Sequence, residues 1–376
     1  DNFPCARQEF EFGLHLLPGR RACAVQFTLE ATALWQPWDR GEPHLYRLSA
    51  ELWDAGDGRP LDGSETTFGV RRVQLSPAWR WEINGRREFL RGVNWAPADA
   101  LPGRVRADDY EQLVGMARQA GVNLLRVWGG LREKRAFYET CDRAGVLVWQ
   151  EFPFACVFFG RLPASAGYLA LVRQESQAIV RALRPHPSVV AWCGGNEFSP
   201  ARNRAVVRAL RESVAALDGT RPFLPASPGR GDRHHWDVWH GGAPASDYRR
   251  DRSHFVSEFG VQAAPAVETL SRYLPADDLW PPGAGWAAHH ADLEKLRRYA
   301  GEDAPDDLHG FVEATQRAQA RALQVGIEHF RRRKGACGGL AVWQWNEPWP
   351  AISWSLIDYC RRPKLAGRWL GRWLGP

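Results

Sequence analysis

The sequence lacks long apolar runs, and its few cysteines do not form a recognisable framework. No stretch approaches the roughly 20 apolar residues of a membrane-spanning helix, so we expect a soluble chain. The seven cysteines are odd in number and include no Cys-x-x-Cys pair. We therefore expect free thiols, with Cys141, Cys156 and Cys193 in the core. The chain begins at Asp1 with no Met or signal peptide, which indicates processing or trimming and leaves the compartment, cytoplasmic, periplasmic or secreted, open.

Signals for nucleic acid, metal ions and phosphate-bearing cofactors are also missing. The net charge of +6 is mildly basic, but the basic run 331–334 falls in the last turn of an expected helix, where cations complement the helix dipole. No nucleic-acid motif accompanies this run. The pairs His234-His235 and His289-His290 lack the i, i+4 spacing of a helical metal site. We therefore expect no metal, no cofactor, no nucleic acid and no membrane as partners; the oligomeric state is open.

The order of strand-like and helix-like segments predicts two domains. Residues 1–84 contain β-rich stretches (9–17, 22–33, 44–54 and 66–75) separated by Gly, Pro and Asp turns, which favours a small Ig-like β-sandwich, complete or lacking part of its N-terminus. From 85 to 376 strands alternate with helix-period segments, which is typical of βα units. The fold class is therefore α/β, a (β/α)8 TIM barrel preceded by the Ig-like domain. The expected barrel strands are 89–95, 122–128, 146–151, 189–197, 222–226, 237–240, 254–258 and 339–346, with an irregular insertion around 275–308.

Two of these strands end in a glutamate. The run from Val189 is apolar and β-branched and ends in Asn196-Glu197, and the run Phe255 to Glu258 has the same form. A carboxylate at the end of an apolar strand is costly to bury unless it has partners or a function. The C-terminal mouth of a parallel barrel is where catalytic side chains lie. Two glutamates in one mouth are the minimum for hydrolysing a glycosidic bond; salt bridges at the mouth are the alternative interpretation.

Several motifs occur in an order that matches a known family. They are residues 35–46 (WQPWDRGEPHLY), 89–95 (FLRGVNW), 125–130 (LRVWGG), 145–152 (GVLVWQEF), 196–197 (NE), 257–260 (SEFG), 343–350 (WQWNEPWP) and 353–355 (SWS). Together they resemble glycoside hydrolase family 2, in particular its β-mannosidase branch, from about residue 34 to 364. The resemblance implies the Ig-like domain, the barrel, and a retaining mechanism on a carbohydrate substrate.

The resemblance also implies roles for residues at the strand ends. It makes Glu258 the nucleophile and Glu197 the acid/base, whose pKa we expect to be raised by its apolar strand and by the neighbouring carboxylate. Asn196 is expected to contact the sugar 2-hydroxyl. Trp128 is expected to line the pocket of the terminal sugar and Trp343 to form its floor, with a core position as the alternative for each indole.

The remaining expected site residues surround the nucleophile. Arg126 is expected to favour the ionised form of Glu258 through its positive charge. His240, at the end of the predicted sixth strand, is expected to hydrogen-bond the same carboxylate, or else to be structural. The expected substrate-binding set is completed by Asn94, Trp95, Glu151 and Trp354.

Departures from the family leave the specificity open. Full-length members carry an N-terminal jelly-roll sugar-binding domain, and usually further β domains after the barrel; we expect this chain to lack both. The insertion, with Trp280 and Trp286, is expected to replace part of the missing wall. We expect a β-mannosidase. The alternatives are a β-glucosidase, exo-β-glucosaminidase or transglycosylase of the same family, an endo-acting relative, a fragment of a longer enzyme, or a catalytically weak carbohydrate-binding relative.

Overall fold

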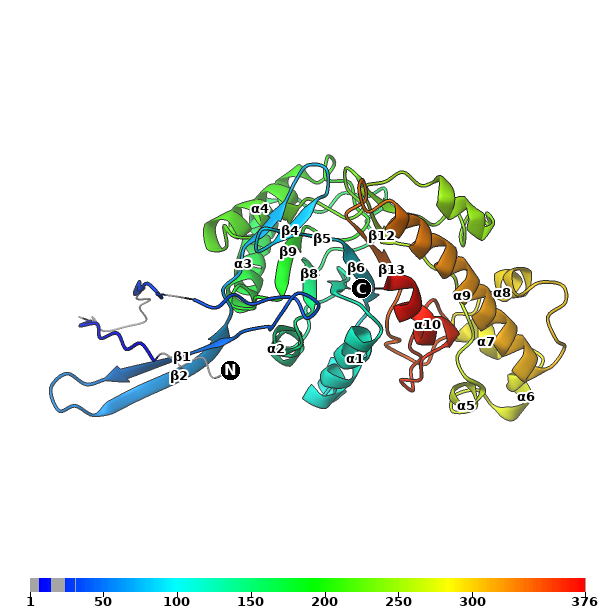
Figure 1. The fold of residues 1–376 in the computed structure, drawn as a ribbon, viewed down its shortest axis with the longest axis horizontal. Coiled ribbons are helices and arrows are strands. Elements are labelled where there is room, and N and C mark those ends of the chain that lie inside the picture. The colour runs from blue at the N-terminus through cyan, green and yellow to red at the C-terminus, as the bar shows by residue number, and fades with distance from the viewer. Residues whose placement is uncertain (1–6, 15–23, 31, 376) are drawn as a thin grey trace.

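An eight-stranded parallel sheet is the centre of the computed structural model, which describes residues 7–14, 24–30 and 32–375 (Figure 1). Its strands are β6 (Leu90–Trp95), β7 (Leu124–Val127), β8 (Leu147–Glu151), β9 (Val189–Cys193), β10 (Phe223–Leu224), β11 (Asp232–His234), β12 (Phe255–Glu258) and β13 (Gly339–Val342). They are hydrogen-bonded in the order β10-β9-β8-β7-β6-β13-β12-β11. Read as a circle that opens between the fifth and sixth strands, this is the order of a (β/α)8 barrel, so the predicted fold class is confirmed.

Helices follow most of these strands. The longer ones are α1 (Ala107–Gln119), α2 (Arg135–Ala144), α3 (Ala166–Leu183), α4 (Arg204–Leu217), α9 (Leu308–Arg332) and α10 (Leu365–Leu374), and the 3-10 helix η2 (Ala245–Arg250) follows β11. Helix α3 begins after Ser165, whose hydroxyl accepts a hydrogen bond from the Tyr168 N–H, a favourable N-cap. Within the described ranges, no helix is both long enough and apolar enough to cross a bilayer.

The segment between β12 and α9 is more regular than expected. It contains four short helices, α5 (Val267–Leu270), α6 (Ala276–Leu279), α7 (Ala284–Ala288) and α8 (Leu293–Ala300). Helix α8 is capped by Asp292, whose carboxylate accepts from the Lys295 N–H. The Pro and Gly residues that suggested an irregular chain lie mainly between these helices, where they end one turn and begin the next.

A long hairpin precedes the barrel. Strands β1 (Tyr46–Trp53) and β2 (Pro60–Phe68) pair antiparallel, and Figure 1 shows the hairpin extending away from the barrel. The expected strands at 9–17 and 22–33 lie partly outside the described residues. Their described parts, 9–14 and 24–30, contain no strand.

A second antiparallel sheet covers the N-terminal end of the barrel. It consists of the three strands β3 (Val73–Leu75), β4 (Trp81–Ile83) and β5 (Arg86–Glu88). Trp79 stacks on Trp149 and Phe255 with ring centroids 6.1 and 5.4 Å apart. A methyl group at Gly338 would lie 1.8 Å from the Trp79 carbonyl oxygen, so only glycine permits this approach. These aromatic side chains fill the N-terminal end of the barrel, and the C-terminal strand ends are left for polar side chains.

Candidate active site

Arg126 on β7 organises the C-terminal mouth of the barrel. Its side chain is fully buried, and it donates hydrogen bonds to Glu258 Oε1 (2.7 Å), Glu151 Oε1 (2.9 Å), Asn94 Oδ1 (2.6 Å) and Asn196 Oδ1 (2.7 Å). Burial alone would lower the pKa of Arg126, but the charges of the two glutamates raise it above its ordinary value. A guanidinium has five donors in one rigid plane. This one side chain therefore sets the positions of four acceptors on four strands or strand ends.

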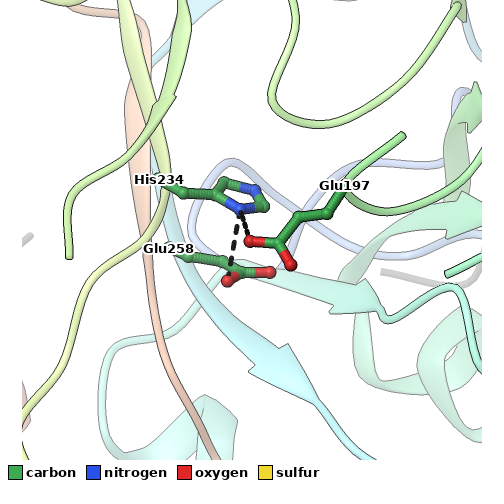
Figure 2. A group of neighbouring side chains, drawn as sticks. All are labelled: Glu197, His234 and Glu258. Atoms are coloured by element: carbon green, nitrogen blue, oxygen red, sulfur yellow. Dashed lines mark hydrogen bonds and ion pairs between the residues drawn. The ribbon is translucent and has the colours of Figure 1, made fainter. Parts of the chain in front are cut away.

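The two predicted catalytic glutamates meet at an imidazole. Figure 2 shows the His234 ring beside both carboxylates: Nδ1 lies 2.9 Å from Glu197 Oε1 and 3.3 Å from Glu258 Oε2. One oxygen of each carboxylate and a ring nitrogen all lie within 4.8 Å of one another. The Glu258 side chain is 4% exposed and that of Glu197 is 22% exposed. Glu197 is thus the more open of the two.

The electrostatics of this group differ from expectation. Burial on its own would raise the pKa of Glu197, but the hydrogen bond and positive charge of His234 and the charge of Arg126 lower it below its ordinary value. Burial likewise disfavours the imidazolium, yet the negative charge of Glu258 and the bond to Glu197 raise the pKa of His234. A raised pKa was predicted for Glu197 from its burial and the second carboxylate, whereas the histidine, which acts in the opposite direction, was not predicted at this site.

The far side of the His234 ring is held by a hydroxyl network. Its Nε2 lies 3.2 Å from Ser227 Oγ. Asp232 Oδ2 accepts from Ser227 Oγ at 2.9 Å and from Ser257 Oγ at 2.7 Å. Both ring nitrogens are therefore occupied, which holds the ring in a position where Nδ1 faces the carboxylates.

Two site residues, His234 and Trp236, were not predicted from the sequence. The sixth strand was predicted at 237–240, whereas β11 ends at His234. Within the described chain His240 forms no hydrogen bond to Glu258; Trp236 Nε1 donates to Glu258 Oε2 at 3.2 Å instead. The sequence signal for this strand was the polar triplet 232–234, which directly follows a turn that contains Gly231.

The Asn-Glu end of β9 depends on a crowded backbone. A methyl group at Gly195 would lie 2.3 Å from the Phe154 carbonyl oxygen, and this glycine has φ +140°. Glu197 itself has φ +50°, and its N–H donates to the Ser227 carbonyl at 2.7 Å. Such a conformation costs a non-glycine residue about 1–3 kcal/mol and is typical of functional sites.

Three of the expected aromatic residues lie at the open end of the barrel. Trp128 and Trp343 are partly exposed, and their rings meet edge to face with centroids 6.2 Å apart. Trp354, also partly exposed, packs edge to face on Trp236 at 5.9 Å and contacts His240 at 5.9 Å. These positions suit contact with a sugar ring.

Trp354 and His240 border a cavity of about 500 Å³. It is also lined by Trp239, Gln262, Ala287, His290, Ala291, Asp292 and Leu293. The insertion contributes His290 and Asp292 to this cavity, and the two tryptophans expected in the wall do not line it. Trp286 is fully buried, and Trp280 packs on Phe311.

The other expected contacts lie below the surface of the site. Trp95 is fully buried, packs on Phe137 with centroids 4.7 Å apart, and donates to Glu133 Oε1 at 2.9 Å. It is a core residue, which corrects its expected contact with substrate. Asn94 and Glu151 are also fully buried; their bonds to Arg126 make them positioning residues.

The cysteine expectation is partly corrected. Cys141 and Cys193 are buried free thiols, whereas Cys156 is exposed. Cys156 Sγ lies 3.8 Å from Glu197 Oε2. Its apolar neighbours in sequence suggested a core position, but Phe158 and Phe159 are themselves exposed.

Fold and site together define a (β/α)8-barrel protein with paired carboxylates at its C-terminal mouth. The family model for glycosyl hydrolases family 2 matches residues 8–71, and the model for the TIM barrel domain of the same family matches residues 79–229. The chain belongs to glycosyl hydrolase family 2. The resemblance read from the motifs is thereby confirmed.

Individual relatives show which members of the family this chain is similar to. The chain is 34% identical to a β-mannosidase B from Thermothelomyces thermophilus, over 91% of this chain and 46% of that protein. It is 36% identical in sequence to a β-D-mannosidase from Dictyoglomus thermophilum. The crystal structure of that protein matches with a TM-score of 0.85 over 91% of this chain and 46% of that one. An exo-chitosanase from Amycolatopsis orientalis, 22% identical with a TM-score of 0.76 over 91% of this chain and 44% of that one, shows a shared fold. The chain spans about half the length of the curated relatives it matches.

Proposed function

We propose that this protein is a retaining β-glycosidase that hydrolyses β-mannosides through Glu258 and Glu197. The close approach of the two carboxylates, with oxygens within 4.8 Å of each other, carries the proposal. Retaining enzymes hold their carboxyl groups about 5–5.5 Å apart, whereas inverting enzymes need about 6.5–9.5 Å to admit a water molecule. The observed spacing supports the retaining geometry.

In the first step the Glu258 carboxylate attacks the anomeric carbon. The bond from that carbon to the leaving oxygen breaks, and Glu197 supplies the proton that this oxygen takes up. In the second step Glu197 removes a proton from water, whose oxygen attacks the anomeric carbon and releases Glu258 as a carboxylate. The greater burial of Glu258, and the greater openness of Glu197, fit a nucleophile below the sugar and an acid/base at the side where the leaving group exits.

His234 has a part in the proton transfer. The raised pKa of His234 and the lowered pKa of Glu197 favour a resting site in which the shared proton lies on the imidazole. As Glu258 forms its ester it loses the negative charge that stabilises the imidazolium. The proton can then move to Glu197 along their 2.9 Å hydrogen bond, and the carboxylic acid formed in this way passes that same proton to the leaving oxygen.

The preference for mannosides rests on the relatives. Two β-mannosidases are 34% and 36% identical to this chain, whereas the exo-chitosanase is 22% identical. The partly exposed rings of Trp128, Trp343 and Trp354 provide flat apolar surfaces of the kind that face sugar rings.

Hydrolysis of aryl β-mannoside and aryl β-glucoside by the wild type and by Glu258→Ala tests the proposal. We expect the mannoside to be the better substrate and turnover to be lost in the variant. Added azide should restore turnover of Glu258→Ala and yield an α-mannosyl azide, since azide then attacks in place of the carboxylate. Glu313→Gln, which removes an exposed carboxylate on α9, is the matched control.

Each contrary result has a distinct meaning. Unchanged turnover in both Glu197→Gln and Glu258→Gln would refute the assignment of the two glutamates. Turnover of the glucoside alone would refute the sugar preference and leave the mechanism standing. Binding of mannose without turnover of either glycoside would favour the carbohydrate-binding alternative.

A further inference from the structure

The two adjacent histidines at the end of β11, His234 and His235, point to different environments. His234 faces the catalytic carboxylates, while His235 contacts the ring of Tyr248 edge to face, with centroids 4.8 Å apart. The His235 side chain is 1% exposed. Neighbouring residues on extended backbone point to opposite sides. The pair His234-His235 lacks the spacing of a helical metal motif, but it places one histidine in each of two sites.

Nδ1 of His235 is held by a buried carboxylate. It lies 2.8 Å from Asp251 Oδ2, and the Asp251 side chain is fully buried. The other oxygen of Asp251 accepts from the Ser253 N–H at 2.7 Å. A histidine that binds a metal through one ring nitrogen usually donates its other N–H to a carboxylate in this way, which orients the ring and makes the ligating nitrogen more basic.

Nε2 of His235 is buried and has no hydrogen-bond partner. It lies 3.4 Å from Asp247 Oδ2 and 3.7 Å from Asp237 Oδ2, and the three atoms lie within 4.8 Å of one another. Ligand atoms at about 2.0–2.2 Å from a tetrahedral zinc ion are about 3.3–3.6 Å apart. A buried, unpartnered nitrogen with one carboxylate oxygen at 3.4 Å and a second at 3.7 Å is close to the ligand spacing of a metal site.

We propose that His235, Asp237 and Asp247 bind a divalent transition-metal ion, with Zn²⁺ as the best fit. One imidazole nitrogen and two carboxylate oxygens are borderline ligands that suit zinc better than calcium or magnesium, which prefer oxygen ligands alone. Water completes the tetrahedron, because the Asp237 side chain is 53% exposed.

The charges around the site favour a cation. Three carboxylates, those of Asp237, Asp247 and Asp251, face two guanidinium groups. Arg233 donates to Asp237 and lies 3.5 Å from Asp251, and Arg250 lies 3.4 Å from Asp247 with its side chain 87% exposed. Exposed pairs of this kind contribute little. Arg233, 42% exposed, can turn into solvent when a divalent ion takes its place.

The group of Glu197, His234 and Glu258 is a weaker candidate for a metal. Both ring nitrogens of His234 already have partners, since Nδ1 faces the carboxylates and Nε2 lies beside the Ser227 hydroxyl. In the second group Nε2 of His235 is available without breaking a hydrogen bond. The proposed ion would also join the end of β11 to η2 and so hold the backbone of Trp236, which donates to Glu258.

Zinc titration of the EDTA-treated full chain, followed by calorimetry, tests this site independently of any glycosidase activity. We expect one Zn²⁺ per chain and a thermal unfolding midpoint that rises with zinc concentration. Co²⁺ in place of zinc should give the intense visible absorption of a tetrahedral site. Asp251→Asn should weaken zinc binding about 10–100-fold, as loss of an outer carboxylate usually does.

Variants separate the two candidate clusters. His235→Gln should abolish zinc binding, and Asp247→Asn, at a partly exposed position, provides the same test if the first variant does not fold. Glu197→Gln and the surface control Glu313→Gln should bind zinc as the wild type does. Absence of zinc binding by the wild type, wild-type affinity in folded Asp247→Asn, or loss of binding in Glu197→Gln would each overturn the proposal.

Discussion

Replacing Arg126 with Met would remove the one cation that joins the four acceptors of the mouth. Methionine keeps much of the buried volume and the flexible apolar stem, so the change is mainly one of charge and hydrogen bonding. Glu151 is fully buried and the Glu258 side chain is 4% exposed. Without the guanidinium, Glu151 stays in a poorly solvated site without its cation, and Glu258 keeps only the His234 imidazole, 3.3 Å away.

Removing one partner of a buried ion pair costs about 3–5 kcal/mol, because the other charge stays desolvated. The amide oxygens of Asn94 and Asn196 lose donors as well, so we expect the Arg126→Met loss to reach at least this range. Domains are stable by only about 5–15 kcal/mol in total, so the variant should be close to unfolding. Arg126→Lys keeps the charge but has three donors for four acceptors. It should cost about 1–3 kcal/mol for the acceptor left unpaired.

Urea denaturation followed by circular dichroism measures these differences. Arg173→Met is the matched control, because Arg173 pairs with Glu212 at 3.5 Å and both side chains are about half exposed. We expect the control to lose no more than about 1 kcal/mol. An Arg126→Met midpoint equal to that of the control would refute the argument that the guanidinium holds the mouth together.

Three further predictions concern single contacts. Trp236→Phe keeps an aromatic ring but removes the N–H that donates to Glu258. The loss of about 1.5–3 kcal/mol for a hydrogen bond to a charged group should lower kcat/KM about 10–100-fold with little change in the unfolding midpoint. Gly195→Ala would place a methyl group 2.3 Å from a backbone oxygen at φ +140° and should cost at least about 2 kcal/mol, whereas Gly115→Ala, where nothing lies within 4 Å, should not destabilise; urea midpoints check both. Burial opposes protonation of His234, but the charge of Glu258 raises the pKa of this imidazole. The stability that His234 contributes is therefore full below its unfolded pKa of about 6.5. This stability is lost as pH rises through the folded pKa. His234→Asn should therefore destabilise most in acid and least in alkali, and a stability difference that grows with pH would contradict this sign.

Long periodic segments of the sequence predicted their structure well. Helices α1 (Ala107–Gln119) and α3 (Ala166–Leu183) lie between predicted barrel strands, where the sequence has helix-period segments. Their apolar faces repeat over several turns, which makes the pattern redundant. Strand β11 has three residues, too few to show a period of two. It was predicted at 237–240, which begins five residues too late, and His240 was therefore named in place of His234.

The positions of the two glutamates followed from the chain alone, because each carboxylate ends an apolar run and parallel strands bring their C-terminal ends to one edge. The sequence could not tell which indoles are exposed at the mouth of the barrel. Trp95 and Trp128 both occur at strand ends, yet one is fully buried and the other partly exposed, because the direction of a side chain depends on strand register and on the helix packed behind it.

The charge state of the site was likewise a property of the folded chain. The pKa of Glu197 depends on His234, which is distant in sequence and reaches it only when β9 and β11 lie in one barrel. The same holds for His235 and Asp247, which η2 brings together. Local sequence determines strands, helices and their ends through hydrogen bonding and periodic burial. Contacts between strand ends determine pKa values and ligand sets, because Coulomb forces and hydrogen bonds act through space at distances that only packing sets.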